Sequence, residues 1–339
     1  MKIISNIESK NLKLEINENG KLLEDLLSRM LKVRIVEEKI AELYREQEMR
    51  CPVHLCIGQE AIAAGVCAGL TDKDYVLSTH RSHGHYLAKG GDMRRMISEI
   101  YGRSTGCSYG KGGSMHLVDL DVGYLGSAPI VGSTIPIAVG TAFGSIMRGD
   151  SQVTVVFFGE GATEEGVFHE SLNFAELKGL PIVFICENNF FSVYSPMEVR
   201  QPKVREIYEL ARGHGIQSYQ GDGNDVVEVY EKTSSAINKA RLGGGPTFIE
   251  FQTYRWREHC GPYYDNNIGY RTESDFLNWK KLCPIKRMVT HVIDQGIMEK
   301  CKIDLIDSQL RADMEDAVNF AKTSSFPDAN MLMEHIYAS

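Results

Sequence analysis

The sequence predicts an α/β fold whose sheet is mainly parallel and flanked by helices. Residues 153–158 and 182–186 are apolar runs rich in β-branched and aromatic side chains, typical of strands buried on both faces. Between them, residues 164–178 carry apolar side chains at roughly helical intervals, and Gly179 and Pro181 end that pattern. A strand, a helix and a strand in this order predict two parallel neighbouring strands.

Further elements are expected on both sides of this unit. Residues 22–48 have the pattern of a long amphipathic helix, and residues 133–147 have that of a tightly packed helix with glycines that admit close contact. Residues 247–251 form another expected strand. From residue 285 onward the chain is mainly helical and ends in a polar tail interrupted by proline. One large α/β domain is favoured over two smaller ones.

Composition weighs against several protein classes. With 339 residues, 43% of them hydrophobic, the chain can bury a large core. A net charge of −8 without a concentrated basic block argues against nucleic-acid binding, and no apolar run is long enough for a membrane helix. The first residues lack the apolar core of a signal peptide, and the eight cysteines show neither close pairs nor metal-binding spacing. We therefore expect a cytoplasmic protein with reduced thiols.

Polar residues follow both strands of the predicted strand–helix–strand unit. Gly159-Glu160-Gly161-Ala162 ends the first strand, and Asn189 follows the second, 29 residues after Glu160. Ligands gather at the carboxyl ends of parallel strands, and Mg²⁺ binds about six oxygens, some of them from phosphate. The carboxylate of Glu160, the amide oxygen of Asn189 and a nearby backbone carbonyl suit this ion. The alternative is that Glu160 caps the next helix and Asn189 lies in an ordinary turn.

Arg81 stands among His80, His83 and His85. Its planar guanidinium suits phosphate oxygens, and histidines titrate near neutral pH. The three histidines are also considered as a zinc site, although no cysteine stands near them at a recognised zinc spacing. Residues 110–113 are rich in glycine, which suits either a close approach of backbone to a ligand or a simple turn.

The segment from Gly159 to Asn189 resembles the thiamine diphosphate fingerprint. Its surroundings resemble the α subunit of two-chain E1 components of 2-oxo acid dehydrogenase complexes, which include pyruvate, branched-chain 2-oxo acid and acetoin enzymes. The usual fingerprint has Asp where Glu160 stands, although Glu occurs in branched-chain-type members; the longer side chain implies a slightly recessed metal. Similar landmarks follow in family order between about residues 25 and 290, at residues 54–61, 79–85, 110–116 and 130–132.

The resemblance implies a thiamine diphosphate-binding fold and a set of site residues. The expected domains are an N-terminal extension (1–20), a domain binding the diphosphate half of the cofactor (21–325) and a C-terminal tail (326–339). Expected metal ligands are Glu160, Asn189 and Phe191, and expected catalytic residues are His259 and His83. The cofactor-binding set is His80, Arg81, Ile130, Val131, Glu160, Gly161, Ala162, Asn189, Phe191, Arg255 and His259.

The resemblance also implies partners and a reaction class. The chain would be part of a thiamine diphosphate-dependent oxidoreductase acting on an aldehyde or oxo group, with Mg²⁺ and an E1 β subunit in an α₂β₂ assembly. Its substrate would be a small 2-oxo acid or an acetoin-like compound, and a lipoylated E2 acyltransferase would accept the acyl group.

The loop around Cys260 departs from the family pattern. Cys260 replaces the Ser that animal mitochondrial members use for regulatory phosphorylation, and residues 261–267 differ from the usual acidic stretch. The acceptor therefore stays open. A carboligase or decarboxylase subunit of a biosynthetic pathway without a lipoyl acceptor is one alternative, and a non-catalytic partner of a β chain is another. His259 is expected to act as acid or base, or to hold the incoming acceptor. The alternative is a loop histidine bonded to backbone.

Overall fold

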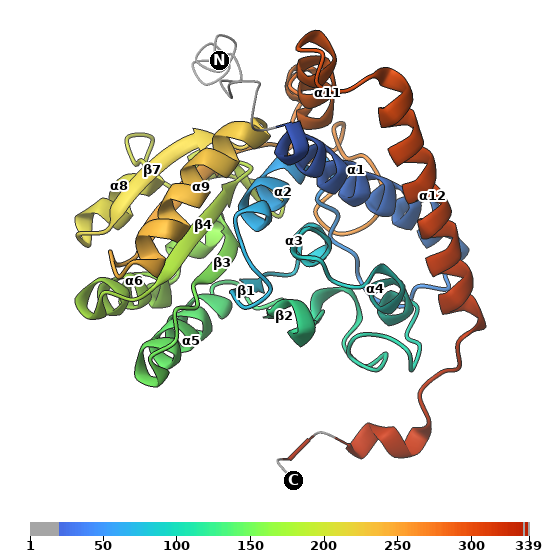
Figure 1. Cartoon of the computed structure of the whole chain (residues 1–339), viewed down its shortest axis with the longest axis horizontal. Helices are drawn as coiled ribbons and strands as arrows, with labels where there is room; N and C mark the ends of the chain where they lie inside the picture. The colour runs from blue at the N-terminus through green and yellow to red at the C-terminus, as the bar shows by residue number, and fades with distance from the viewer. Residues whose placement is uncertain (1–19, 335, 338–339) are drawn as a thin grey trace.

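A six-stranded parallel sheet forms the centre of the molecule (Figure 1). The computed structural model describes residues 20–334 and 336–337, so the expected extension at 1–20 lies outside the described residues except for Gly20. The strands stand in the order β2 (Tyr124–Ser127), β1 (Tyr75–Ser78), β3 (Thr154–Gly159), β4 (Ile182–Asn188), β8 (Thr247–Gln252) and β7 (Gln217–Asp222). A separate antiparallel pair is formed by β5 (Phe191–Ser192) and β6 (Ser195–Pro196).

Helices cover both faces of the sheet. Alternate residues of the central strands enter two different cores: Val155 and Phe157 pack in one, and Val156 and Phe158 in the other. The first core is closed by helices that include α1 (Gly20–Leu43), α2 (Glu60–Ala68), α9 (Val226–Arg241) and α11 (Pro284–Asp294). The second is closed by α5 (Thr134–Arg148), α6 (Gly166–Lys178) and α8 (Ile207–Gly213). Burial on both faces explains why the strands lack polar alternation.

Five more α-helices complete the described part of the fold. α12 (Lys300–Thr323) packs against α1 and α4 along the outer edge, and the chain beyond it projects from the body (Figure 1). The other α-helices are α3 (His83–Lys89), α4 (Met93–Ile100), α7 (Met197–Arg200) and α10 (Glu273–Lys281). Short 3₁₀ turns are η2 (Tyr44–Glu46), η3 (Gly113–Met115), η4 (Leu120–Val122), η5 (Glu160–Glu164) and η6 (Ala329–Met333).

The predicted elements are present, with shifted ends. The helix expected over 164–178 begins only at Gly166, because Glu165 has an extended backbone and η5 precedes it. The helix expected over 22–48 ends at Leu43, followed by η2 and by Gln47 in a left-handed conformation. Within the described residues, no helix is both long and apolar enough to span a membrane. All eight cysteines are free.

Candidate active site

The carboxyl ends of β3 and β4 face a cavity of about 200 Å³. The two strands pair in parallel with Gly159 opposite Glu187, so Glu160 and Asn189 leave the sheet at the same edge. The cavity is lined by His54, Gln59, Thr79, His80, Arg81, Met115, Pro129, Val131, Gly132, Gly159, Glu160, Gly161, Ala162, Glu187, Asn189, Phe191, Ser192, Val193 and His259. The edge where the sequence predicts a ligand site is therefore hollow.

Glu160, Asn189 and Phe191, the three expected metal ligands, all line this cavity. Glu160 and Asn189 are both buried. The Asn189 side chain accepts from the backbone N–H of Phe191 at 3.2 Å and donates to Gln59 Oε1 at 3.3 Å, which fixes the orientation of its amide. Phe190 has a left-handed backbone (φ 69°) that turns the chain sharply here. Carboxylate, amide and carbonyl oxygens are donors that Mg²⁺ prefers.

A cationic side chain already lies against Glu160. Arg200 Nη2 is 2.5 Å from Glu160 Oε1, and Arg200 Nη1 pairs with Glu164. Burial raises the pKa of the Glu160 carboxyl, and the charge of Arg200 acts in the opposite direction. The guanidinium of Arg200 is a cation bound to Glu160, so the surroundings of this carboxylate accommodate positive charge.

Gly161 lets the β5–β6 hairpin approach η5 closely. A Cβ at this position would lie 2.9 Å from Ser192 Oγ and 3.2 Å from Ser192 Cβ, so a larger residue would require Ser192 to shift. Because Phe191 precedes Ser192 in this hairpin, the glycine lets the cavity-lining residue Phe191 lie close to η5.

Arg81 is a buried cation without a carboxylate partner. Its Nη1 donates to the Leu55 carbonyl at 2.6 Å, and its Nη2 to the His259 carbonyl at 3.3 Å. In the part of the chain that the structure describes, no carboxylate lies within ion-pair distance of it. Burial, aided by the charge of Arg255, lowers the pKa of Arg81 to about 10. A buried positive charge left without a counterion suits an anion such as phosphate.

Three imidazoles gather beside Arg81. The ring centroids of His54, His80 and His259 are 4.6–5.2 Å apart. Burial and the charge of Arg81 lower the pKa of His54 to about 2 and the pKa values of His80 and His259 to about 3, so all three are neutral at pH 7. The Nδ1 atom of His54 is buried without a hydrogen-bond partner.

The imidazole cluster offers nitrogen atoms within 4.8 Å of one another. That spacing also suits a transition metal. However, Arg81 Nη2 lies 3.5 Å from His259 Nδ1, and a second positive charge there would be repelled. The cluster therefore favours hydrogen bonding to an anionic or carbonyl ligand.

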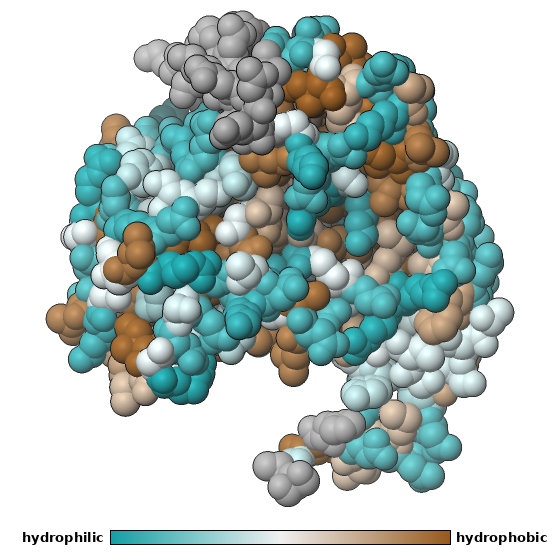
Figure 2. Space-filling model, in the orientation of Figure 1, coloured by the Kyte–Doolittle hydropathy of each residue, from teal (hydrophilic) through white to brown (hydrophobic). Residues whose placement is uncertain are grey.

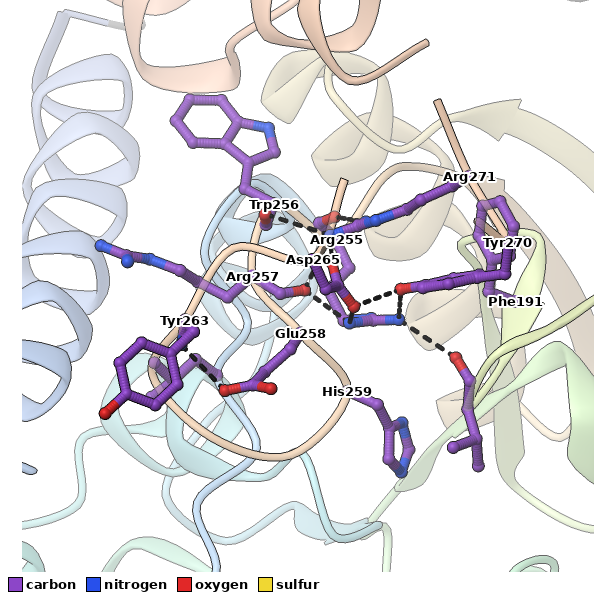
Figure 3. Close-up of polar contacts among 12 residues, drawn as sticks. Phe191, Arg255, Trp256, Arg257, Glu258, His259, Tyr263, Asp265, Tyr270 and Arg271 are labelled. Atoms are coloured by element: carbon purple, nitrogen blue, oxygen red, sulfur yellow. Dashed lines mark hydrogen bonds and ion pairs between the residues drawn. The ribbon is translucent and has the colours of Figure 1, made fainter. Parts of the chain in front are cut away.

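The loop from residue 253 to residue 271 carries His259 on a polar scaffold (Figure 3). Arg255 is buried, donates to the Val193 carbonyl at 3.3 Å and the Tyr270 hydroxyl at 3.1 Å, and lies 3.8 Å from Asp265. Asp265 also accepts from Arg271 and from the hydroxyl of Tyr270. The imidazole of His259 points away from this network, and His259 lines the cavity.

Some predicted site residues lie outside the cavity wall. His83 is fully buried, with Nδ1 2.6 Å from Glu37 Oε1 and Nε2 2.6 Å from Ser114 Oγ. His85 contacts Ser78 and Glu187 instead. The histidines at 80, 83 and 85 therefore do not converge, and the zinc alternative for them is wrong.

Ile130 and Arg255 are expected to bind the cofactor, and the glycine-rich segment is expected either at a ligand or in a turn. None of them lines the cavity. Ile130 is 72% exposed and is not among the cavity-lining residues, and Arg255 is buried behind the wall. The backbone N–H groups of Gly110, Gly112 and Gly113 donate to the Glu99 carboxylate, so they serve a turn around a buried side chain.

Sequence reasoning did not single out His54, Gln59 or Arg200. His54 and Gln59 lie in the 54–61 segment, whose similarity to a family landmark was the available signal. Arg200 is one arginine at the end of the four-residue helix α7, and no local pattern distinguishes it.

Comparisons with known proteins find similar sequences over most of the chain. The model of the dehydrogenase E1 component family matches residues 28–330. The chain is 36% identical over 315 residues to the α subunit of acetoin:2,6-dichlorophenolindophenol oxidoreductase from Bacillus subtilis, covering 93% of each chain. It is 37% identical to the pyruvate dehydrogenase E1 component subunit α of Porphyra purpurea, covering 91% of each. The testis-specific mitochondrial form of that subunit from Homo sapiens is 35% identical, over 91% of this chain and 78% of the relative.

Proposed function

Because this chain belongs to the dehydrogenase E1 component family, we propose that it holds the metal and diphosphate half of thiamine diphosphate in an α₂β₂ enzyme. The chain is an E1 α-type subunit of pyruvate or acetoin dehydrogenase-type complexes, and this family uses thiamine diphosphate. The observation that carries the proposal is the meeting of Glu160 and Asn189 with the uncompensated cation Arg81 in one cavity.

The proposed metal ligands are Glu160, the amide oxygen of Asn189 and the backbone carbonyl of Phe191. All are hard oxygen donors. In the metal-free chain, Arg200 occupies Oε1 of Glu160. Gly161 and Ala162 present backbone beside the metal. On the same wall, Arg81 and His80 would bind the diphosphate.

Three further residues are proposed to act on the cofactor from around the cavity. Backbone at Ile130 and Val131 would support the cofactor ring, because Val131 lines the cavity, Ile130 is its neighbour in sequence, and both residues are exposed. Arg255 would act from behind, through its bonds to Val193 and to the loop that carries His259.

When bound, thiamine diphosphate supplies a carbanion that adds to a substrate carbonyl and an electron sink for decarboxylation. His259 is proposed to move a proton. The contact of its Nδ1 with the Arg81 guanidinium favours a proton on Nε2, and its lowered pKa keeps the ring neutral. With its proton on Nε2, a neutral imidazole can donate that proton to a reacting oxygen, and Nε2 then takes a proton back.

His83 is assigned a supporting part in the catalytic set. Its ring bonds Ser114, and the neighbouring Ser82 hydroxyl donates to the Ser114 carbonyl at 3.2 Å. These contacts hold η3, whose Met115 lines the cavity. His83 would therefore position the cavity wall.

A second chain is proposed to complete the site. The cavity is smaller than the roughly 300–1,000 Å³ of typical ligand pockets. Ile137 and Met147 of α5 are 55% and 71% exposed, and hydrophobic side chains are visible at the α5–α6 end of the molecule in Figure 2. Apolar surface of this kind supports an interface with an E1 β subunit. The relatives are named as α subunits, which implies partner subunits for them.

The same proposal includes the domain limits, the compartment and the acyl acceptor. We propose one cofactor-binding domain over residues 21–325 and a tail over 326–339, which the family match at 28–330 supports. Eight free cysteines suit a reducing compartment such as the cytoplasm. A small 2-oxo acid or an acetoin-like compound is the proposed substrate, and a lipoylated E2 acyltransferase the proposed acceptor.

The test is to copurify the chain with its β subunit and titrate thiamine diphosphate with and without Mg²⁺. A panel of 2-oxo acids and acetoin is then assayed with a lipoyl domain or an artificial electron acceptor. Metal-dependent cofactor binding and acyl transfer are expected. A joined carbon–carbon product without lipoyl transfer would favour the carboligase alternative. Absence of cofactor binding in the complex would favour a non-catalytic partner.

A further inference from the structure

Arg200 bridges two carboxylates at the proposed metal site. Its Nη2 is 2.5 Å from Glu160 Oε1, its Nη1 pairs with Glu164, and its Nε donates to the Ser195 carbonyl at 3.2 Å. The Arg200 side chain is 13% exposed and that of Glu160 only 2%. All the nitrogens of the guanidinium are thus engaged, and one of them lies on Oε1, one of the two carboxylate oxygens that Glu160 can offer to a metal.

The charge of this arginine cannot be switched off by loss of a proton. A guanidinium stays protonated in proteins, so it relieves the buried Glu160 as long as it remains in place. A divalent cation bound to the same oxygen would stand within a few ångströms of the guanidinium, and the two positive charges would repel strongly at low dielectric. Arg200 and a metal are therefore alternatives for Glu160 Oε1.

Two residues near Arg200 can bind its guanidinium in place of Glu160. Glu164 is exposed at the end of η5 and already binds Arg200, so it can keep the guanidinium when Glu160 is released. Gln201 donates to the same Glu164 oxygen at 2.9 Å, while its own Oε1 is buried without a hydrogen-bond partner. Gln201 follows Arg200 in the sequence, and its Oε1 accepts no hydrogen bond within the described residues. This oxygen is therefore free to accept one from a displaced guanidinium.

We propose that Arg200 is a place-holding cation, which neutralises Glu160 in the metal-free chain and moves toward Glu164 when a divalent cation binds. The inference rests on the metal site proposed above and adds a consequence to it. Metal loading becomes an exchange of one cation for another. The metal-free chain is stabilised by Arg200, and the affinity for the metal is lowered by the work of displacing it.

Arg200→Gln tests the exchange, because glutamine keeps hydrogen-bonding capacity without the charge. Mn²⁺ binding is followed by electron paramagnetic resonance in the complex with the β chain at fixed thiamine diphosphate. Thermal unfolding of the full chain is followed without metal. We expect about tenfold tighter Mn²⁺ binding and a lower melting temperature for the metal-free variant.

Two further variants keep the test decisive. Arg212→Gln removes the same charge from an exposed pair with Glu209 and should change neither measurement. Arg200→Lys keeps the charge but loses the fork that joins two carboxylates, so it should bind Mn²⁺ more tightly than the parent chain and less tightly than Arg200→Gln. If Arg200→Gln does not fold, Arg200→Lys still shows whether Arg200 competes with the metal.

The outcomes separate this inference from the proposed function. If the parent chain binds Mn²⁺ and both Arg200 variants bind it equally well, Arg200 is not a place-holder and the metal site stands. If the parent complex does not bind Mn²⁺ with thiamine diphosphate, the metal site itself is wrong.

Discussion

Arg81 donates through Nη2 to the backbone carbonyl of His259 at 3.3 Å, across 178 residues of sequence. The residue proposed to bind the diphosphate therefore also holds the loop that carries the proposed acid–base group. A disturbance of one should reach the other, so variants at this contact must be measured for both cofactor binding and turnover.

His259→Ala should slow turnover by about 10²–10⁴-fold, the usual contribution of a positioned acid or base. Cofactor affinity should stay within about threefold, because the variant loses only the 3.5 Å contact of Arg81 with His259 Nδ1 and keeps the 3.3 Å bond to the His259 backbone carbonyl. Steady-state kinetics and calorimetry of the αβ complex measure the two effects. His214→Ala, in a half-buried histidine at the end of α8, should change neither. An unchanged kcat for His259→Ala would remove its catalytic role.

Glu160→Ala should abolish Mg²⁺-dependent binding of thiamine diphosphate. The variant removes the only carboxylate in the proposed ligand set and leaves Arg200 without a partner on that side. Titration calorimetry of the αβ complex with and without Mg²⁺ checks it. Glu170→Ala, on the exposed face of α6, is the matched control. Equal metal-dependent affinity in Glu160→Ala and the parent would refute the site.

Asp265→Asn should destabilise the loop from residue 253 to residue 271 by about 3–5 kcal/mol, the usual cost of leaving a buried ion-pair partner alone. Arg271 is fully buried against Asp265, and Arg255 lies 3.8 Å from it. Hydrogen exchange of the loop amides measures the effect. Asp150→Asn breaks an exposed pair with Arg148 and should cost less than about 1 kcal/mol. Unchanged protection in Asp265→Asn would contradict the scaffold.

Acid should destabilise the chain through the imidazole cluster. The folded-state pKa of His54 is about 2, below its ordinary value of 6.5. The unfolded chain therefore binds more protons below pH 6.5, and stability is lost as the pH falls from 6.5 toward the folded-state pKa. One such histidine contributes about 1.4 kcal/mol per pH unit.

His54→Gln should flatten this dependence by that amount, which urea unfolding between pH 7.5 and pH 5 can measure. His116→Gln, at an exposed position, should keep the slope of the parent. The same slope in His54→Gln and the parent would show that His54 is not the group that titrates.

The fold and the proposed metal side of the site follow from local patterns in the sequence. Continuous apolar runs and one helical period predict β3, α6 and β4, and parallel pairing then brings Glu160 and Asn189 to one edge. The role of His83 could not be read in this way. His80 and His83 are three residues apart, yet α3 begins at His83 and turns its ring toward Glu37 while His80 faces the cavity.

Arg200 escaped prediction for a different reason. It reaches Glu160 across 40 residues through the hairpin and α7, and that contact depends on tertiary packing. Neither secondary-structure propensity nor residue spacing predicts the contact between Arg200 and Glu160. The glycine-rich segment shows the same limit, because sequence alone does not say which partner its amides will find.

Glu99 gives the glycine-rich segment a hydrogen-bond acceptor from within the chain. Four backbone N–H groups, from Ser108, Gly110, Gly112 and Gly113, donate to its carboxylate at 2.8–2.9 Å. The conformational entropy of this stretch is therefore lost when the chain folds, before any ligand arrives. Ligand entry next to Met115 then meets a wall that is already ordered, so association there should be limited by encounter and desolvation instead of by loop closure.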